Sequence, residues 1–376
     1  MAGALGDRYH RRMGATLCVG VTHAPMFAYS DDHMADIFRR QLASARLPAD
    51  LRDSGNWPEQ MAREFGREGE NVAGNAKRER ERVIGAYREV RRVIDEFEPD
   101  VILIWGDDQY ENFQEDLVPP FCVYAAPEYR SQPLMRAPWA LGDPDNIWGE
   151  ARDTTFVVKG HPDAGRHVAR ELLERDIPVA YAYKTGLHKE GLAHAFMNTV
   201  LYLDYDRTGF DYPILPFHVN CYGSSLIRNR GALGIDVDGP DEDPPAPSPR
   251  LCFDVGRLTA RIMADSPWRV VLIGSSSWSH AFLTAKNHFL FPDLEADRAR
   301  LEELKAGSVA GWRDLSLRQI EESGQAEFLN WVCLAGALSE LGATPAILDY
   351  TDSYIFNSSK CTMIAWPAVQ TVRAGV

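Results

Sequence analysis

The chain has 376 residues, of which 45% are hydrophobic and 25% charged, and its formal net charge is −14. A chain of this length buries a large core, and its negative charge argues against a nucleic acid or an anionic membrane as a partner. Six scattered cysteines form no CxxC pair, so a zinc knuckle or disulfide scaffold is not indicated and we expect a cytoplasmic protein. No stretch approaches membrane-spanning length, and the first residues lack the apolar stretch of a signal peptide.

The first predicted element is a short buried strand over Thr16–Val21. It ends at Thr22-His23-Ala24-Pro25, where the proline cannot continue a strand ladder. Residues 58–98 are rich in Glu, Arg and Ala and carry apolar residues at helical spacing. They predict a long amphipathic helix, within a helical insertion at about 30–98.

The segment Val101–Phe113, VILIWGDDQYENF, runs from apolar into polar residues. Its five bulky residues, Val101 to Trp105, predict a buried strand. The turn that follows carries four polar side chains, namely Asp107, Asp108, Gln109 and Glu111. Ligands of open α/β sheets bind beyond the carboxyl ends of the strands, so these side chains are candidates for a polar site.

Helices and strands alternate through the rest of the chain. The pattern predicts a helix after Pro162, a strand at Ile177–Tyr183, a helix at Gly191–Val200 and a strand at Ile214–Val219. Residues 239–250, rich in Pro and acidic residues, predict a surface loop rather than a domain boundary. A helix near Cys252–Met263, a strand at Val270–Gly274 and a helix at Gln325–Leu341 follow. We therefore expect one catalytic α/β domain over 1–376, with a mixed or mostly parallel central sheet flanked by helices.

Two histidines, His23 and His280, directly follow apolar strands, where a site is expected. With carboxylates at Asp108 and Glu327 they supply the ingredients of a mononuclear metal centre. The serines at 275–277 lack the final glycine of a nucleophile elbow, so a serine hydrolase is poorly supported. His188 and His194 are six residues apart and would not share a helix face, which argues against a ligand pair there.

Taken in order, several short segments resemble the class III extradiol ring-cleavage dioxygenases, in particular the β subunit of protocatechuate 4,5-dioxygenase. The resemblance spans most of the chain. The matching pieces are Thr22-His23-Ala24-Pro25, VILIWGDDQYENF, Lys159-Gly160-His161-Pro162-Asp163, His188, Pro216-Phe217-His218-Val219-Asn220, Ser279-His280, Ser323-Gly324 with Glu327 and Trp331, and Asn357-Ser358.

The resemblance implies a metal held by two histidines and one glutamate. His23 matches the first ligand and Glu327 matches the carboxylate, but the second histidine is missing. Counting back from Phe113, the ligand position falls on Gln109; counting forward from the strand, it falls on Asp108. The residues around the turn favour Gln109, with Asp108 as the alternative.

The resemblance also implies the other roles. His280 matches an acid/base that takes a proton from the bound diol, and His188 matches a pocket histidine. Asn357 and Ser358 fall where the family binds a substrate substituent. The implied cofactor is Fe(II), with Zn or Mn as alternatives and no organic cofactor. The implied reaction is extradiol cleavage by O₂ of the ring of a catechol-like diol or aminophenol.

Two alternatives stay open, a metal-dependent hydrolase or lyase on the same fold and a metal-free, non-catalytic relative. The expected partners are a small aromatic substrate and O₂, with no nucleic acid and no membrane. We also expect a homo-oligomer, specifically a dimer, and the family adds a small α-type subunit as a further partner.

Overall fold

The chain folds around an eight-stranded mixed sheet with the strand order β6-β3-β7-β2-β8-β1-β10-β9. The structure, a computed structural model, describes residues 14–135, 137–185, 191–223 and 244–367. The four central strands, β1 (Thr16–Val21), β2 (Val101–Gly106), β7 (Ile214–Val219) and β8 (Val270–Ser275), are parallel. Their carboxyl ends therefore meet at one edge of the sheet.

Antiparallel strands complete the sheet on both sides. β3 (Phe121–Tyr124) pairs antiparallel with β7 and parallel with β6 (Ala180–Ala182). On the other side, β10 (Lys360–Trp366) pairs antiparallel with both β1 and β9 (Thr344–Thr351). A separate ribbon joins β4 (Glu128–Ser131) to β5 (Phe156–Lys159). The predicted mixed or mostly parallel central sheet is thus confirmed.

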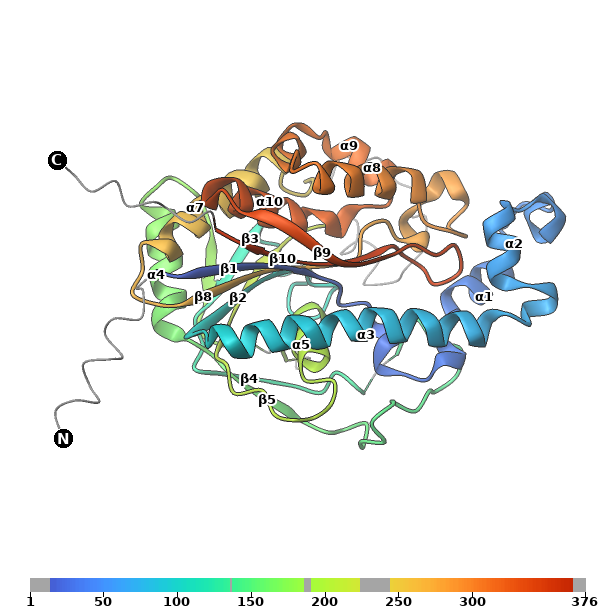
Figure 1. Cartoon of the computed structure of the whole chain (residues 1–376), viewed down its shortest axis with the longest axis horizontal. Coiled ribbons are helices and arrows are strands. Elements are labelled where there is room, and N and C mark those ends of the chain that lie inside the picture. Colours follow the sequence, from blue (N-terminus) through green and yellow to red (C-terminus); the bar gives the residue numbers. More distant parts are fainter. Residues whose placement is uncertain (1–13, 136, 186–190, 224–243, 368–376) are drawn as a thin grey trace.

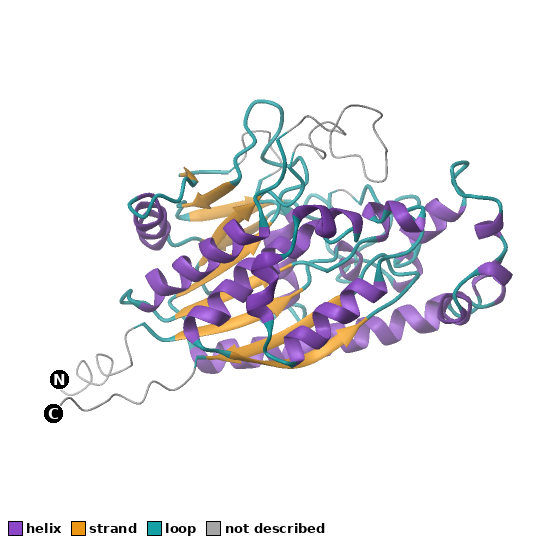
Figure 2. Cartoon of the chain, turned by 90° about the horizontal axis from the view of Figure 1, so that it is seen from above, coloured by secondary structure: helices purple, strands orange, loops and turns teal. Residues whose placement is uncertain are grey.

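Helices cover both faces of the sheet (Figures 1 and 2). One core cluster includes residues of α3 (Val72–Phe97) and α5 (His194–Leu203). The other includes residues of α4 (Pro162–Leu173), α7 (Pro249–Ala264) and α10 (Leu329–Leu341). Side chains of a strand alternate between faces, so Ile102 and Ile104 belong to the first cluster, whereas Leu103 and Trp105 belong to the second.

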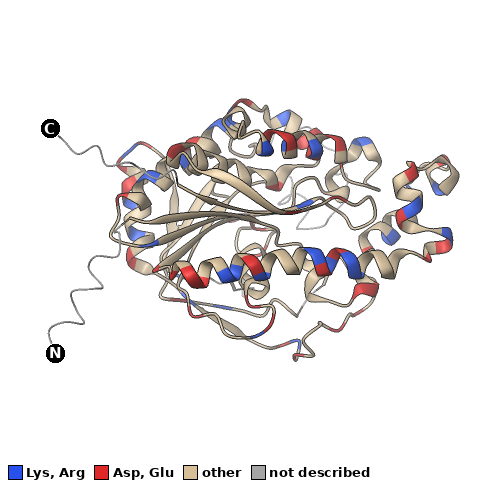
Figure 3. Cartoon of the chain, viewed as in Figure 1, with Lys and Arg blue, Asp and Glu red and all other residues tan. Residues whose placement is uncertain are grey.

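The remaining helices add further side chains to the two core clusters. α1 (Asp36–Leu42) and α2 (Glu59–Phe65) extend beyond the sheet at the right of Figure 1, while α8 (Leu294–Lys305) and α9 (Leu317–Glu322) lie above it. Lys, Arg, Asp and Glu concentrate on the helices, and the central strands carry almost none (Figure 3). No helix among the described residues combines the length and apolar character needed to cross a membrane.

Some predicted boundaries differ from the structure. The helix expected over 58–98 is divided into α2 and α3, because Gly66 adopts a φ of +75° and ends α2. The loop expected to end at 250 stops earlier among its described residues, because Ser248 caps α7 and accepts a hydrogen bond from the Leu251 amide. The strand expected at 177–183 is limited to Ala180–Ala182.

Glycine allows α10 to approach the sheet and α7 very closely. A Cβ atom on Gly20 of β1 would lie 2.2 Å from the Trp331 ring, and one on Gly256 would lie 1.8 Å from the Cys333 carbonyl oxygen. Only a residue without a side chain fits at either position. This packing fixes the first turn of α10, which follows the short helical turn Ala326–Phe328.

Candidate metal centre and active-site pocket

Four of the side chains singled out from the sequence meet at the carboxyl edge of the sheet. His23 follows β1, Gln109 follows β2 and His280 follows β8. Glu327 reaches the same place from the turn before α10. Parallel strands explain this convergence, because their carboxyl ends lie side by side.

Three buried side chains form a group that could hold a metal ion, namely His23, Asp107 and Glu327. Their ligand atoms all lie within 4.8 Å of one another. The Nε2 atom of His23 is 3.3 Å from Oε2 of Glu327 and 3.6 Å from Oδ1 of Asp107. One nitrogen and two carboxylates suit a divalent cation.

The hydrogen bonds of His23 determine which ring nitrogen faces this group. Its Nδ1 lies 3.0 Å from the backbone carbonyl oxygen of Ser275, which can only accept, so Nδ1 carries the proton. Nε2 then faces two carboxylates, so this nitrogen either carries a second proton or presents its lone pair to a cation between them. Nε2 of His23, Oδ2 of Asp107 and Oε2 of Glu327 are buried and have no hydrogen-bond partner among the described residues.

Asp107 is fully buried at the end of β2, and among the described residues only one of its two carboxylate oxygens has a hydrogen-bond partner. Its Oδ1 accepts a hydrogen bond of 3.0 Å from Nδ2 of Asn330 on α10. Burial, followed by the negative charge of Glu327, raises the pKa of Asp107. The sequence alone does not single out Asp107 as a ligand, because the family pattern directs attention to the two residues after it.

Gln109 lies beside the metal group and contacts its carboxylate. Its Nε2 donates to Oε1 of Glu327 at 2.9 Å and to the Tyr222 hydroxyl at 2.7 Å. Tyr222 also donates to the same Oε1 atom. These contacts hold one oxygen of Glu327 and leave Oε2 facing the histidines. Although burial opposes its ionisation, His280 and His23 keep the pKa of Glu327 below its usual value.

Asp108 has a different environment from both of its neighbours. Its carboxylate accepts hydrogen bonds from the backbone amides of Glu111, Asn112 and Phe113, at distances of 2.9 to 3.3 Å. It therefore closes the turn after β2, in the manner of an Asx turn. Asp108 is not part of the group of ligand atoms formed by His23, Asp107 and Glu327.

His280 contacts Oε2 of Glu327, whereas Gln109 contacts Oε1. Its Nδ1 donates to the Trp278 carbonyl oxygen at 3.0 Å, and its Nε2 lies 3.3 Å from Oε2 of Glu327. Burial lowers the pKa of His280, although the charge of Glu327 opposes this effect. The preceding residue is fixed by Asp297 of α8, which accepts hydrogen bonds from the amide and hydroxyl of Ser279.

His188 lies outside the described residues, but a second histidine of the same segment reaches the pocket. His194, at the start of α5, has its Nδ1 3.0 Å from Oε2 of Glu111, and its ring meets the His23 ring edge to face at 5.2 Å. Burial lowers the pKa of His194, but Glu111 outweighs it, and the pKa rises to about 10. The position of His194 before an apolar helix was the only sequence signal for it.

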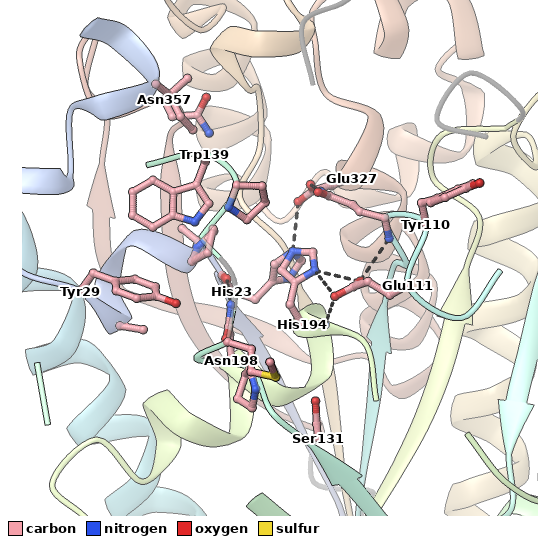
Figure 4. Close-up of a pocket in the computed structure, with 18 of the residues that line it drawn as sticks. His23, Tyr29, Tyr110, Glu111, Ser131, Trp139, His194, Asn198, Glu327 and Asn357 are labelled. Carbon is pink, nitrogen blue, oxygen red and sulfur yellow. Dashed lines mark hydrogen bonds and ion pairs between the residues drawn. The ribbon is translucent and has the colours of Figure 1, made fainter. Parts of the chain in front are cut away.

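A cavity of about 320 Å³ is lined by His23, Gln109, His194, His280 and Glu327, whereas Asp107 and Asp108 are not among its described lining residues. Its volume is close to the lower end of the roughly 300–1,000 Å³ typical of small-molecule sites. Figure 4 shows His23, His194 and Glu327 together, with Tyr29 and Trp139 on one side and Tyr110 and Glu111 on the other. Asn357 lines the cavity as well. Ser358 is fully buried and forms a backbone bridge with His280, but it is not among the described lining residues.

No protein-family model matches the chain. Three curated relatives share the name 2,3-dihydroxyphenylpropionate/2,3-dihydroxicinnamic acid 1,2-dioxygenase. The protein from Paraburkholderia phymatum is 28% identical over 300 residues, covering 71% of this chain and 86% of the relative. The one from Burkholderia vietnamiensis is 28% identical, covering 70% and 83%, and the one from Paraburkholderia xenovorans is 25% identical, covering 69% and 82%.

Among solved structures, an uncharacterized protein from Escherichia coli K12 aligns with a TM-score of 0.44 and 11% identity, over 75% of this chain and 91% of that chain. The curated relatives are named for substrates with two adjacent hydroxyls on a benzene ring. They favour neither a hydrolase or lyase nor a non-catalytic protein. The chain is thus a homologue of dioxygenases named for catechol-like substrates, which confirms the class of function predicted from its sequence.

Proposed function

We propose that this protein is a metal-dependent dioxygenase that cleaves the ring of a catechol-like substrate beside its two hydroxyls, with extradiol regiochemistry. The observation that carries the proposal is the convergence of the ligand atoms of His23, Asp107 and Glu327, because His23 and Glu327 also line a cavity of substrate size. The named activity of the relatives supports it. We also propose that the protein is a class III enzyme and that it resembles the β subunit of protocatechuate 4,5-dioxygenase.

The metal we propose is Fe(II), with Mn or Zn as alternatives. The donor set fits a divalent ion, since one imidazole nitrogen and two buried carboxylates converge with their ligand atoms within 4.8 Å of one another. When bound there, the ion supplies Lewis acidity toward the diol and redox chemistry toward O₂. No organic cofactor is required.

We propose His23, Asp107 and Glu327 as the ligands, with Gln109 orienting Glu327 through the hydrogen bond at Oε1. The prediction that Gln109 is itself a ligand remains the competing proposal, because the oxygen and nitrogen of an amide are assigned from their contacts. Asp108, as the third candidate, would have to exchange its hydrogen bonds to the turn for a metal.

We propose separate roles in catalysis for the other side chains of the pocket. His280 presents Nε2 to the cavity with Nδ1 fixed by the Trp278 carbonyl, so Nε2 is placed to accept and hold the proton of a diol hydroxyl. The buried cavity walls restrict water around the reacting ring. Asn357 and Ser358 keep their predicted role at the substrate substituent, and His188 keeps its predicted role as a pocket histidine.

The test loads the metal-free protein with Fe(II) under anaerobic conditions and then exposes it to air with a panel of catechols and aminophenols. We expect O₂ consumption with formation of a yellow ring-opened product. No O₂ uptake across the panel contradicts the proposal. Stoichiometric zinc in protein purified without added metal, with turnover that needs no O₂, would instead indicate a hydrolase or lyase.

The ligand assignment is tested by Asp107→Asn, Asp108→Asn and Gln109→Leu in parallel, with Glu327→Gln as the reference for a lost ligand. We expect Asp107→Asn to lose bound iron as Glu327→Gln does. Gln109→Leu should keep iron and lower turnover, because it removes one of two hydrogen bonds to Oε1 of Glu327 and leaves the three proposed ligands in place. Iron retained in Asp107→Asn and lost in Gln109→Leu would reverse the assignment.

The expectations about the whole protein remain proposals of the same kind. We propose a single catalytic domain that forms a dimer, with a small α-type subunit as a further partner. All six cysteines are free and buried, which supports a reducing cytoplasm as its location.

A further inference from the structure

Part of the cavity wall comes from the helical insertion and from the loop at residues 137–142. Ile37 on α1 lines the cavity, and so do Pro138 and Trp139 of the loop. The Trp139 ring meets the ring of Tyr29 edge to face, with centroids 5.5 Å apart. Figure 4 shows both rings at the left of the cavity. An apolar wall of this kind suits the ring or the substituent of an aromatic substrate rather than its hydroxyls.

Two hydrogen bonds attach this loop to α1. The Leu141 backbone amide donates to Oδ2 of Asp36 at 2.7 Å. Nη1 of Arg40 donates to the Pro138 carbonyl oxygen at 2.5 Å. The two bonds lie on either side of Trp139 along the chain, and Trp139 is 5% exposed. They therefore hold the loop at the point where the indole joins the cavity wall.

The carboxylate of Asp36 is the centre of this attachment. Asp36 is 2% exposed, and it does not belong to the described lining of the cavity. Nδ1 of His33 lies 2.7 Å from its Oδ2, and Nη1 of Arg39 donates to its Oδ1 at 2.9 Å. A charged acceptor forms stronger hydrogen bonds than a neutral one. Removing this carboxylate would therefore leave the Leu141 amide without its acceptor.

The helix that carries Asp36 is itself packed into the insertion. Phe38 of α1 is 1% exposed. Its ring centroid lies 5.7 Å from that of Trp57 and 5.3 Å from that of Phe65 on α2. Close packing of this kind leaves a helix little freedom to shift. The loop is therefore attached to a fixed support.

We propose that Asp36 is a positioning residue that holds Trp139 in the cavity wall, and that this wall favours catechols with an apolar ring substituent over unsubstituted catechol. The substituent packs on Trp139 and Ile37, while the diol faces the metal group. Asp36 acts through the loop and touches no reacting atom. The proposal rests on the proposed function of the adjoining metal site.

Hydrogen exchange tests the attachment of the loop without any substrate. Asp36→Ala removes the acceptor of the Leu141 amide, whereas Asp32→Ala makes the same change at an exposed aspartate of the preceding turn. We expect exchange in a peptide spanning residues 137–142 to become at least about fivefold faster in Asp36→Ala and to stay unchanged in Asp32→Ala. Equal exchange in Asp36→Ala and the wild type overturns the proposal.

Two further variants separate a local change from a loss of folding. Asp36→Asn keeps one oxygen acceptor, so its exchange should lie between that of Asp36→Ala and that of the wild type. Arg40→Met removes the second hydrogen bond to the loop at an exposed residue, where a substitution has little effect on folding. It should also accelerate exchange in the loop, and unchanged exchange there would contradict the attachment even if Asp36→Ala does not fold.

Selection by the wall is tested with catechol, 3-propylcatechol and 4-propylcatechol. Binding to the protein loaded with Fe(II) is measured by calorimetry without O₂, and kcat is measured separately by O₂ uptake. We expect one propyl compound at least to bind the wild type about tenfold more tightly than catechol. Asp36→Ala should lower this preference at least about fivefold and leave the Kd and kcat of catechol unchanged. A preference that is absent from the wild type, or intact in Asp36→Ala, overturns the proposal.

A cycle of single and double variants tests whether Asp36 acts through Trp139. Trp139→Leu should lower the same preference, and Asp36→Ala should lower it little further when the two are combined. Losses that add in the double variant contradict a shared effect. The expected preference and its loss without any O₂ uptake would refute the dioxygenase while supporting the wall. O₂ uptake with the preference intact in Asp36→Ala would do the opposite.

Discussion

Two buried groups of charged side chains near the cavity are satisfied to very different degrees. In the first, the Lys360 ammonium lies 2.6 Å from Oε1 of Glu79 on α3 and donates to the carbonyl oxygens of Phe356 and Ser358, at 3.0 and 2.7 Å. One cation faces one anion at ion-pair distance, and two of the three donors of the ammonium bond to carbonyl oxygens. This pair ties α3 to the segment that carries Asn357.

The second group is the metal centre, where two carboxylates face the imidazoles of His23 and His280 and three polar atoms have no hydrogen-bond partner among the described residues. Burial without compensation costs stability, so such a group persists only when something other than folding requires it. The charges of the first group therefore serve the structure, and those of the second serve the function. The Glu79–Lys360 pair holds the cavity wall, whereas the metal centre is arranged to receive a cation.

The largest effect is expected from removing the cation of the Glu79–Lys360 pair. Lys360→Met should lower the free energy of unfolding by about 3–5 kcal/mol, because it leaves the Glu79 carboxylate buried and unpaired. Chemical denaturation measures the loss. The double variant Glu79→Gln/Lys360→Met should recover part of it, and equal losses in the single and double variants would show that the pair is not coupled.

Another buried carboxylate, Asp297, should make the stability of the protein depend on pH. Burial raises its pKa from 3.8 to about 6, although Ser279 and Gln325 donate to it. The folded state therefore binds the proton more tightly than the unfolded chain. The resulting stabilisation is complete below pH 3.8 and is lost as the pH rises through about 6, a change of about 3 kcal/mol.

Urea unfolding of the wild type and of Asp297→Asn between pH 4 and 7 isolates this contribution. The contributions of the other titrating groups cancel when the two unfolding free energies are subtracted. The decline in stability with rising pH should be smaller in the variant. Parallel pH profiles for the two proteins would contradict the assignment to Asp297.

The smallest expected change in the free energy of unfolding is a gain in stability rather than a loss. Asp107→Asn should raise the stability of the metal-free protein by about 1–3 kcal/mol, because it removes a buried carboxylate that lies beside Glu327 and keeps the acceptor for Asn330. Thermal unfolding with and without Fe(II) checks this. The wild type should gain stability from the metal and the variant should not, whereas a destabilised metal-free variant would show that Asp107 serves the fold.

The strand pattern predicts the fold well where apolar residues end abruptly. The predicted strands Thr16–Val21 and Ile214–Val219 have the bounds found in the structure, and the parallel arrangement brings His23 and His280 to one edge. β9 and β10 were not predicted. β9 is mostly half-buried at the sheet edge and its residues do not alternate clearly, so its sequence lacks the signal of a core strand.

The site was harder to predict than the fold, because composition does not show where each side chain of a turn points. Asp107 and Asp108 are identical and adjacent, yet the first faces His23 and the second faces the amides of its own turn. His194 is placed by the pairing with Glu111, a contact between residues that are far apart in the sequence. Only the three-dimensional structure provides these distinctions.

The distance along the chain between His23 and Glu327 has a consequence for unfolding. About 300 residues separate them, and one follows the first strand while the other precedes the last helix. A cation shared by the two would act as a reversible cross-link that closes a loop of almost the whole domain. Because the entropy of an open chain grows with the length of the loop that a cross-link closes, such a contact would restrict the unfolded ensemble far more than a local one.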